Sequence, residues 1–214
     1  MTPSEQYEES EVSARAAAIM QTDHWQHAFE ANEYLILESV LTEPLRTVAH
    51  EYAIKRALLS RETTSAGAAP GTPSFYGDPL MDTLLDLLQS VAETFTGLEL
   101  FPTFSDLRVY ARGAIVNPHT QRPAGEIALS VSLGFDAPKP WPFFVGTRHG
   151  FQAAHLAPGD GILYRASECP HWRGEFDGEH QVQAFFHYVA SQGPNAEWKY
   201  DKRRLSEVDN GEGR

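Results

Sequence analysis

The sequence predicts an α+β domain that is mainly β, with helices in its N-terminal part and a barrel or sandwich of short strands after them. In residues 43–59, and again between Pro79 and Gly97, apolar residues recur at helical spacing. From Leu98 onward they alternate in short runs that are separated by glycine and proline. The length of 214 residues suits one domain.

The charge balance excludes two classes of partner. The chain has 17 Lys and Arg against 29 Asp and Glu, and a net charge of -12. It therefore lacks the basic footprint of a nucleic-acid binder, and an anionic membrane surface would repel it. A local basic pocket for a small anion remains compatible with this composition. We expect neither a nucleic acid nor a membrane as partner.

Cysteine content and the N-terminal segment indicate the compartment. Cys169 is the single cysteine, so internal disulfides and cysteine-rich zinc sites are excluded. Residues 1–11 are acidic and polar, without the basic and apolar regions of a signal peptide. No apolar run approaches the roughly 18 residues that a membrane helix needs. We therefore expect a cytoplasmic protein.

The first part of the chain is weakly patterned. Residues 13–20 are compatible with a short helix, inside what we expect to be an N-terminal extension of residues 1–33. The apolar run of residues 34–38 predicts a strand. Residues 60–76 are rich in Ser, Thr, Gly, Ala and Pro, and predict a long loop of the kind that is often functional.

Two helices are predicted with their ends. Thr42 is placed as an N-cap, and apolar residues at helical spacing predict a helix over residues 43–59. Asp78 followed by Pro79 begins a second helix by the same logic. Gly97 is expected to end it, because glycine adopts the left-handed conformation of a helix C-terminus readily.

The remaining chain predicts strands. Ala128, Ser130 and Ser132 form one face of a strand, and such small residues suit a barrel interior that leaves room for a ligand. We expect one domain over residues 34–198 and a flexible charged tail over residues 199–214. The predicted strands are Leu107–Arg112, Ile127–Leu133, Phe143–Val145, Gln152–Leu156, Ile162–Tyr164 and Gln181–Ala190.

Two of the nine histidines have contexts that indicate a function. His119 follows a predicted strand in the segment Val-Asn-Pro-His-Thr-Gln, and His171 lies in Cys-Pro-His-Trp-Arg after a Pro-Gly-Asp turn and a strand. The two are far enough apart in the chain to come from different strands of one barrel. His187 alternates with Phe185, and we expect it to be packed inside its strand.

Several short motifs occur in one order. Together they resemble the Fe(II)/2-oxoglutarate-dependent dioxygenases, and most closely the prolyl-hydroxylase-like branch and its small bacterial relatives. The resemblance covers about residues 34–190. The motifs are Y-x-x-G-x-x-x-x-P-H, formed by Tyr110, Gly113, Pro118 and His119; Pro158-Gly-Asp160; His171-Trp-Arg173 followed by Gln181 to Tyr188; Pro102 to Ser105; and Trp141-Pro142.

The resemblance implies a fold and a chemistry. The family has a double-stranded β-helix, or jelly roll, braced by N-terminal helices. Its members hold Fe(II) with two histidines and a carboxylate, which implies His119 and His171 as metal ligands. They bind 2-oxoglutarate and O₂ at the open positions and oxidise a small molecule or an amino-acid side chain. Hydroxylation is the usual outcome, while desaturation, cyclisation and halogenation share the early steps. The resemblance implies no catalytic residue beyond the metal site.

The sequence departs from the family at the third metal ligand. Gln121 stands where the family has Asp, and its amide oxygen can coordinate a metal but carries no charge. Three outcomes are open: Gln121 ligates weakly, it leaves a two-histidine site, or the oxygenase chemistry is lost. Glu126 is the nearest spare carboxylate, and we expect it to be structural or to support the ligands indirectly.

The second departure concerns the co-substrate. Gln181 occupies the position where the family usually has the Arg or Lys that pairs with 2-oxoglutarate. The nearest candidates to replace it are Arg108, Arg112 and Arg173, because Arg suits a bidentate carboxylate contact. Tyr110 alternates with Arg108 and Arg112 on one strand face and is a further candidate for a contact with 2-oxoglutarate.

Two hypotheses follow from these departures. The first is an iron- and 2-oxoglutarate-dependent oxygenase with an atypical His-x-Gln and distal His site. The second is a non-catalytic relative that uses the barrel pocket to bind a ligand or a partner. A weaker third possibility is an oxygenase that does not use 2-oxoglutarate. The resemblance in fold does not decide the type of reaction.

Overall fold

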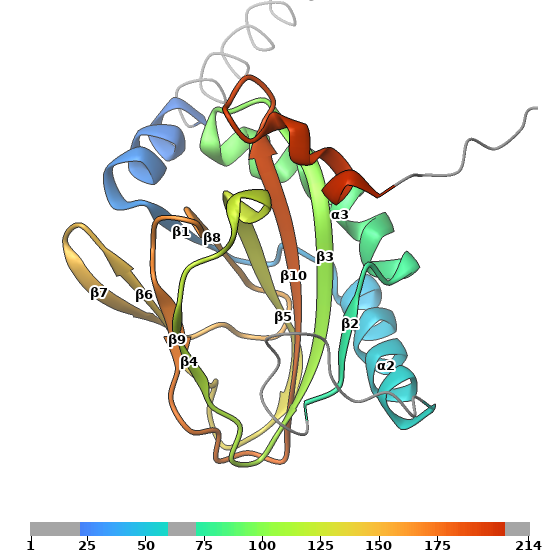
Figure 1. The fold of residues 1–214 in the computed structure, drawn as a ribbon. Helices are drawn as coiled ribbons and strands as arrows, with labels where there is room; N and C mark the ends of the chain where they lie inside the picture. The colour runs from blue at the N-terminus through green and yellow to red at the C-terminus, as the bar shows by residue number, and fades with distance from the viewer. Residues whose placement is uncertain (1–21, 60–71, 204–214) are drawn as a thin grey trace, which may run out of the picture.

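The computed structural model describes residues 22–59 and 72–203, and its strands form two antiparallel sheets (Figure 1). The larger sheet has the order β1-β8-β5-β10-β3-β2 and the smaller has the order β4-β9-β6-β7. The strands of the larger sheet are β1 (Tyr34–Leu37), β8 (Gly161–Tyr164), β5 (Ile127–Asp136), β10 (His180–Ala190), β3 (Leu100–Ala111) and β2 (Ser74–Tyr76). Those of the smaller sheet are β4 (Val116–His119), β9 (His171–Arg173), β6 (Phe143–Thr147) and β7 (Gly150–Ala154).

The helices come mainly before the long strands. A helix covers residues 22–32, and it is followed by α2 (Glu43–Leu59) and α3 (Pro79–Thr96). The predicted ends of α3 are confirmed: the Asp78 side chain accepts a hydrogen bond from the Leu80 amide at 3.0 Å, and Gly97 has a φ of 71°. Two short 3-10 helices are η1 (Pro123–Gly125) and η2 (Ala196–Lys202). No described helix has the length and apolar character needed to cross a membrane.

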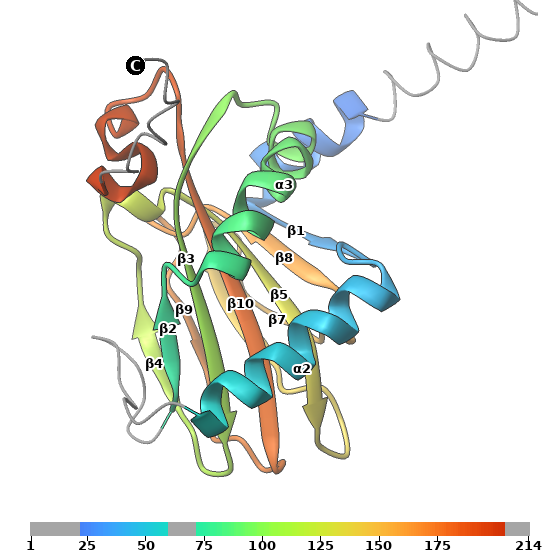
Figure 2. The same cartoon turned by 90° about the vertical axis from the view of Figure 1, so that its right-hand side faces the viewer.

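The apolar core lies between the larger sheet and the helices. Figure 2 shows α2 and α3 running across one face of this sheet. Leu84 and Leu85 of α3 pack in one cluster with Leu129 and Val131 of β5, and all four side chains are almost fully buried. Burial of such side chains provides most of the driving force for folding. The opposite face of the sheet is left for the pocket described below.

Three short strands were not predicted. Strand β2 lies inside the segment expected to be a loop, so the prediction for residues 60–76 is wrong at residues 74–76, while residues 60–71 lie outside the described part. Strands β4 and β9 are also additional, and His119 is the last residue of β4 rather than a residue after a strand. Strands of three or four residues carry too few positions to show a period, and their pairing partners define them. The predicted helix over residues 13–20 lies outside the described residues.

Two local features concern a proline inside β3 and the contact of residues 199–203 with the domain. Pro102 lies within β3, where the register against β10 shifts between His187 and Tyr188; a proline is tolerated at such an irregularity because it has no amide hydrogen to donate. The first residues of the predicted tail, 199–203, contact the domain in η2 and just after it. Arg203 pairs there with Asp82 at 2.6 Å.

Candidate metal and co-substrate site

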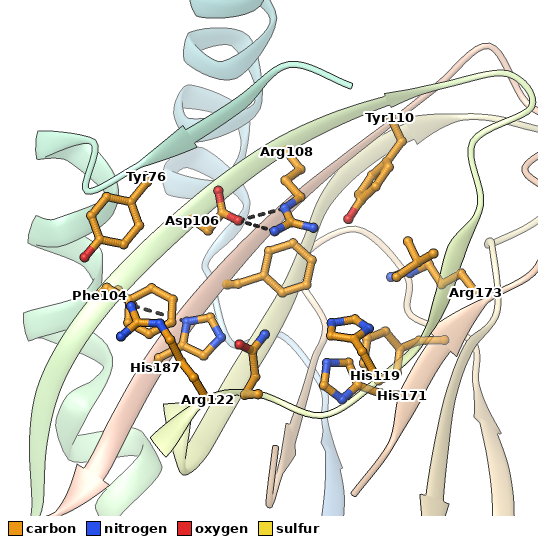
Figure 3. A pocket seen from close by; sticks show the side chains of 14 residues that line it. Tyr76, Phe104, Asp106, Arg108, Tyr110, His119, Arg122, His171, Arg173 and His187 are labelled. Atoms are coloured by element: carbon orange, nitrogen blue, oxygen red, sulfur yellow. Dashed lines mark hydrogen bonds and ion pairs between the residues drawn. The ribbon is translucent and has the colours of Figure 1, made fainter. Parts of the chain in front are cut away.

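A pocket of about 490 Å³ lies between the two sheets, and residues of both line it (Figure 3). This volume falls in the range of small-molecule sites. Three arginines and one aspartate line the pocket, so its lining is basic in a chain that is strongly acidic overall. The lining residues are Tyr76, Phe104, Asp106, Arg108, Tyr110, Val116, His119, Gln121, Arg122, Phe143, His171, Arg173, Phe185 and His187.

The pairing of β4 with β9 brings the two predicted histidines together. His119 and His171 are partners in the antiparallel register, and their ring centroids lie 4.3 Å apart. Figure 3 shows the two rings side by side on one wall of the pocket. The strand pairing therefore brings His171 next to His119 although the two are far apart in the sequence, because directly opposite residues in an antiparallel pair lie close together.

Each of these imidazoles is held by a backbone carbonyl. His119 Nδ1 donates to the Asn117 carbonyl at 2.9 Å, and His171 Nδ1 donates to the Cys169 carbonyl at 3.0 Å. Placing the proton on Nδ1 leaves the Nε2 lone pair available as a metal ligand. Burial lowers the pKa of His171 to about 4, so its ring is neutral at physiological pH, which is the form that binds metals.

Gln121 lies in the same pocket. Its backbone amide donates to the Ala166 carbonyl at 2.8 Å, and its side chain lines the cavity with the two histidines. The described residues contain no group of three His, Cys, Asp or Glu side chains that could hold a metal. The carboxylate that lines the pocket, Asp106, is paired with Arg108, so a third protein ligand beside the two histidines would be the Gln121 amide oxygen. Two imidazole nitrogens and one oxygen donor fit Fe(II) and leave further positions open.

Glu126 does not supply the missing carboxylate. Its Oε2 atom accepts from the Ala190 amide and from Asn195 Nδ2, both at 3.3 Å, and the residue is not among those that line the pocket. These contacts agree with the structural role that the sequence suggested for it.

Arg173 is a buried cation that lines the pocket. It is only 3% exposed; Nη1 donates to the Trp141 carbonyl at 2.7 Å, and Nη2 donates to Gln183 Oε1 at 3.0 Å. Within residues 22–59 and 72–203, no carboxylate pairs with it. Burial lowers the pKa of Arg173 to about 10, and a buried charge without a counterion costs several kcal/mol. An anionic ligand would offset this cost.

Arg108 differs from Arg173 although it faces the same cavity. Its guanidinium forms an ion pair with Asp106, with an Nη2 to Oδ2 distance of 2.6 Å, and Asp106 also accepts from Ser74. Arg112, the third arginine considered from the sequence, pairs with Glu179; both side chains are mostly exposed, and neither residue lines the pocket. Of the three candidates, Arg173 alone carries its charge unpaired among the described residues.

The other two co-substrate candidates lie at different depths. Tyr110 lines the pocket, and its ring meets Trp141 edge-on at 5.2 Å. Burial raises the pKa of Tyr110, so its hydroxyl keeps its proton. Gln181 is buried but does not line the pocket. Its amide donates to Ser132 Oγ at 3.2 Å and to Gln183 Oε1 at 3.1 Å, and so belongs to the network behind Arg173.

The sequence did not indicate two residues with an unpartnered polar atom, one lining the pocket and one contacting His171. His187 was expected to be a packed strand residue, and it is indeed buried, but it also lines the pocket and its Nε2 has no hydrogen-bond partner. The buried Tyr164 hydroxyl likewise lacks a partner, while its ring meets His171 edge-on at 4.9 Å. Side-chain alternation along β10 could have placed His187 on the pocket face. Nothing in the sequence marked Tyr164.

Comparison with known proteins identifies the fold. The sequence matches no protein-family model, and no curated protein is similar to it. A prolyl-4-hydroxylase from Pseudomonas putida is similar in structure, with a TM-score of 0.66 at 13% identity over 79% of this chain and 98% of that one. The α-ketoglutarate-dependent epimerase SnoN from nogalamycin biosynthesis has a TM-score of 0.67 at 13% identity, over 80% and 82% of the two chains.

A third similar structure is HygX from Streptomyces hygroscopicus with nickel and 2-oxoglutarate bound, with a TM-score of 0.61 at 11% identity over 78% and 86% of the two chains. The fold is that of the 2-oxoglutarate-dependent oxygenases. The jelly roll that the sequence predicted is therefore confirmed. At these identities the likeness extends to the fold, and the chemistry has to be argued from the site.

Proposed function

We propose that this protein is a non-haem iron- and 2-oxoglutarate-dependent oxygenase that hydroxylates a small molecule or an amino-acid side chain. The observation that carries the proposal is the opposed pair His119 and His171, each with Nδ1 bound to a carbonyl and Nε2 left available, in a pocket that also holds the unpaired Arg173. Metal ligands and a counterion for an anionic co-substrate thus occur together in one cavity.

The metal would be held by three side chains. His119 and His171 would contribute Nε2 donors, and Gln121 would contribute its amide oxygen. When bound, Fe(II) with 2-oxoglutarate and O₂ supplies the oxidising chemistry, in which the keto acid becomes succinate and CO₂ while substrate is oxidised. Because Gln121 is uncharged, we expect the metal to bind at least 10–100-fold more weakly than with a carboxylate there.

Arg173 would bind the far carboxylate of 2-oxoglutarate. Two of the five N–H donors of its guanidinium are accounted for by Trp141 and Gln183, and the others remain for a ligand. The protonated hydroxyls of Tyr110 and Tyr164 are suited to donate to the same carboxylate. This arrangement places the cation two residues after the distal histidine on β9, so that both side chains point to one face of the strand.

Arg108 and Gln181 would act indirectly. Arg108 holds Asp106 and contributes positive potential to the cavity, which favours the dianionic 2-oxoglutarate. Gln181 fixes Gln183, which in turn orients Arg173. The far end of the pocket, around Tyr76, Phe104 and Asp106, would receive the substrate. We also propose that α2 and α3 brace the larger sheet and that the protein acts in the cytoplasm.

One observation favours a second function. An uncharged Gln121 at the third ligand position suits a relative that binds a ligand in the barrel without catalysis, or an oxygenase that does not use 2-oxoglutarate. The substitution Gln121→Asp separates these possibilities. It would raise metal affinity without harming the native function of a binding protein, and it would change turnover in an oxygenase.

The test is succinate production. Purified protein with Fe(II), ascorbate, 2-oxoglutarate and air should release succinate, at a higher rate with suitable substrates from a small-molecule and amino-acid panel. The His171→Ala variant should release none, while His180→Ala should behave as wild type, because His180 does not line the pocket. Absence of succinate with every substrate, from a protein shown to be folded, would refute the proposal.

A further inference from the structure

The buried His187 nitrogen is a polar atom that the proposed function leaves unexplained. His187 is 1% exposed, Nδ1 donates to the Phe104 carbonyl at 3.3 Å, and its ring stacks on Phe104 with centroids 4.0 Å apart. With the proton on Nδ1, Nε2 is an acceptor that receives no hydrogen bond. A buried acceptor without a donor is costly, and in native proteins such atoms usually have a partner.

The Gln121 side chain, whose NH₂ group is a hydrogen-bond donor, lies beside His187. A Cβ placed on Gly125 would lie 3.1 Å from His187 Cδ2, 3.0 Å from Gln121 Cβ and 3.3 Å from Gln121 Cγ. The two side chains therefore approach each other across a glycine, and the absence of a side chain there permits the approach. Cδ2 is bonded to Nε2 in the ring, and Cγ is bonded to the carbon of the Gln121 amide, so the possible donor and acceptor each lie one or two bonds from these neighbouring atoms.

We propose that His187 positions Gln121 as a metal ligand: His187 Nε2 accepts a hydrogen bond from the Gln121 NH₂ group, which turns Gln121 Oε1 toward the metal. The inference rests on the proposed function, since it requires a metal at His119 and His171. His187 is a positioning residue here, because it acts on the metal through Gln121.

The pairing also explains why this site has an amide in place of a carboxylate. A glutamine offers one oxygen to the metal and two N–H donors to a neighbour, whereas an ionised aspartate offers acceptors only. Beside an imidazole that presents a lone pair, a carboxylate would oppose acceptor to acceptor. His187 and Gln121 are therefore matched to each other.

Co(II) binding tests the pairing without dependence on turnover. Titration of the chelator-stripped full chain with Co(II) alone, followed by its visible d–d bands, reports both affinity and ligand geometry. We expect His187→Phe to weaken Co(II) binding about 10–100-fold, the range seen when a partner of a metal ligand is removed. His187→Gln, which restores an acceptor oxygen, should recover part of the affinity. His180→Phe on the same strand should have no effect.

A double-mutant cycle assigns the effect to Gln121. In a Gln121→Ala background, His187→Phe should change Co(II) affinity less than twofold, because the residue to be positioned is gone. In a His187→Phe background, Gln121→Asp should raise affinity more than it does beside His187. Equal losses from His187→Phe with Gln121 and with Ala at position 121 would overturn the inference.

Failure of the proposed metal site and failure of the positioning role of His187 give different results. If folded wild-type protein binds no Co(II), the proposed metal site is wrong and the positioning role falls with it. If wild-type protein binds Co(II) and His187→Phe binds it equally well with the same spectrum, the metal site stands and the positioning role alone is refuted. If His187→Phe does not fold, the His187→Gln variant with and without Gln121→Ala decides the same question.

Discussion

The two faces of the larger sheet have opposite character although the same strands form both. On the helix side, β5 places Leu129 and Val131 and β10 places Phe186, all fully buried in the apolar core. On the pocket side, the alternating residues include buried polar ones, such as Ser130 and Gln183, which are hydrogen-bonded to each other. One face thus serves stability, and the other carries groups that stability alone would not favour.

The energetically unfavourable groups lie on the pocket side of the sheet. Three buried side-chain atoms lack a hydrogen-bond partner in the described part of the chain; one, His187 Nε2, belongs to a residue that lines the pocket, and another, Tyr164 Oη, to a residue whose ring contacts His171. Arg173 adds a buried charge without a described counterion. Where a native protein leaves buried polar groups without partners, the exception usually lies at a functional site. The difference between the two faces therefore locates the site independently of any motif.

The largest expected effect is a difference in stability between substitutions of two adjacent phenylalanines. Phe186→Ala should lower the free energy of unfolding by about 3–5 kcal/mol, because it opens a cavity in the apolar core. Phe185→Ala, on the half-buried pocket side, should cost less than about 1.5 kcal/mol. Urea denaturation of the two variants measures the difference. Equal losses would mean that the two faces do not differ in their contribution to stability.

Arg173 tests whether the pocket side trades stability for binding. Arg173→Met should weaken 2-oxoglutarate binding at least about 100-fold, or ~2.7 kcal/mol. It should also raise the free energy of unfolding of the ligand-free protein by about 1 kcal/mol, since it removes an unpaired buried charge. Calorimetric titration and urea denaturation give the two values. Arg108→Met is the matched control and should lower stability, because it leaves Asp106 unpaired.

Stability at low pH should depend on His187. Burial lowers its pKa in the folded state to about 3, while the unfolded chain has the usual value near 6.5. The unfolded state alone takes up the proton between these values, so the free energy of unfolding falls as pH falls, by up to about 1.4 kcal/mol per pH unit. Because the lowered pKa of His171 contributes a slope of the same sign, His187→Phe in metal-free protein should reduce the slope between pH 6 and 4 by about 1 kcal/mol per pH unit without removing it. An unchanged slope would contradict the buried, neutral ring.

The smallest effect concerns the C-terminal contact at the pocket. Arg122, a lining residue, forms a 2.6 Å ion pair with Asp201 of η2, and the Arg122 side chain is 43% exposed. The Asp201 side chain is only 10% exposed and also accepts from Tyr76. Asp201→Asn should nevertheless cost only about 1 kcal/mol, because the Arg122 partner faces solvent and asparagine keeps an oxygen that accepts hydrogen bonds. Thermal unfolding at two salt concentrations measures it. A loss of several kcal/mol would show that η2 is part of the core.

The sequence predicted several features that depend on local pattern, although it did not predict the helix over residues 22–32. The ends of α3 follow from Asp78 and Gly97, and the two faces of β5 and β10 follow from alternation. The structural similarities then confirmed the jelly roll that the motifs suggested. In each of these cases, neighbouring residues carry the signal.

What the sequence did not predict depends on long-range register. The short strands β4 and β9 exist because they pair, and that pairing sets His119 opposite His171. The choice of Arg173 over Arg108 as the unpaired cation depends on Asp106 and on burial, which no spacing reveals. The approach of His187 to Gln121 depends on Gly125, a residue without a motif.

The central claim is that the pocket binds Fe(II) and 2-oxoglutarate together, and an anaerobic titration tests it most directly. The account predicts a visible metal-to-ligand charge-transfer band that saturates at one Fe(II) and one 2-oxoglutarate per chain. Arg173→Met should shift its midpoint to higher 2-oxoglutarate concentration, and His171→Ala should abolish it. A folded wild-type protein that takes up no Fe(II) and develops no band would contradict the account.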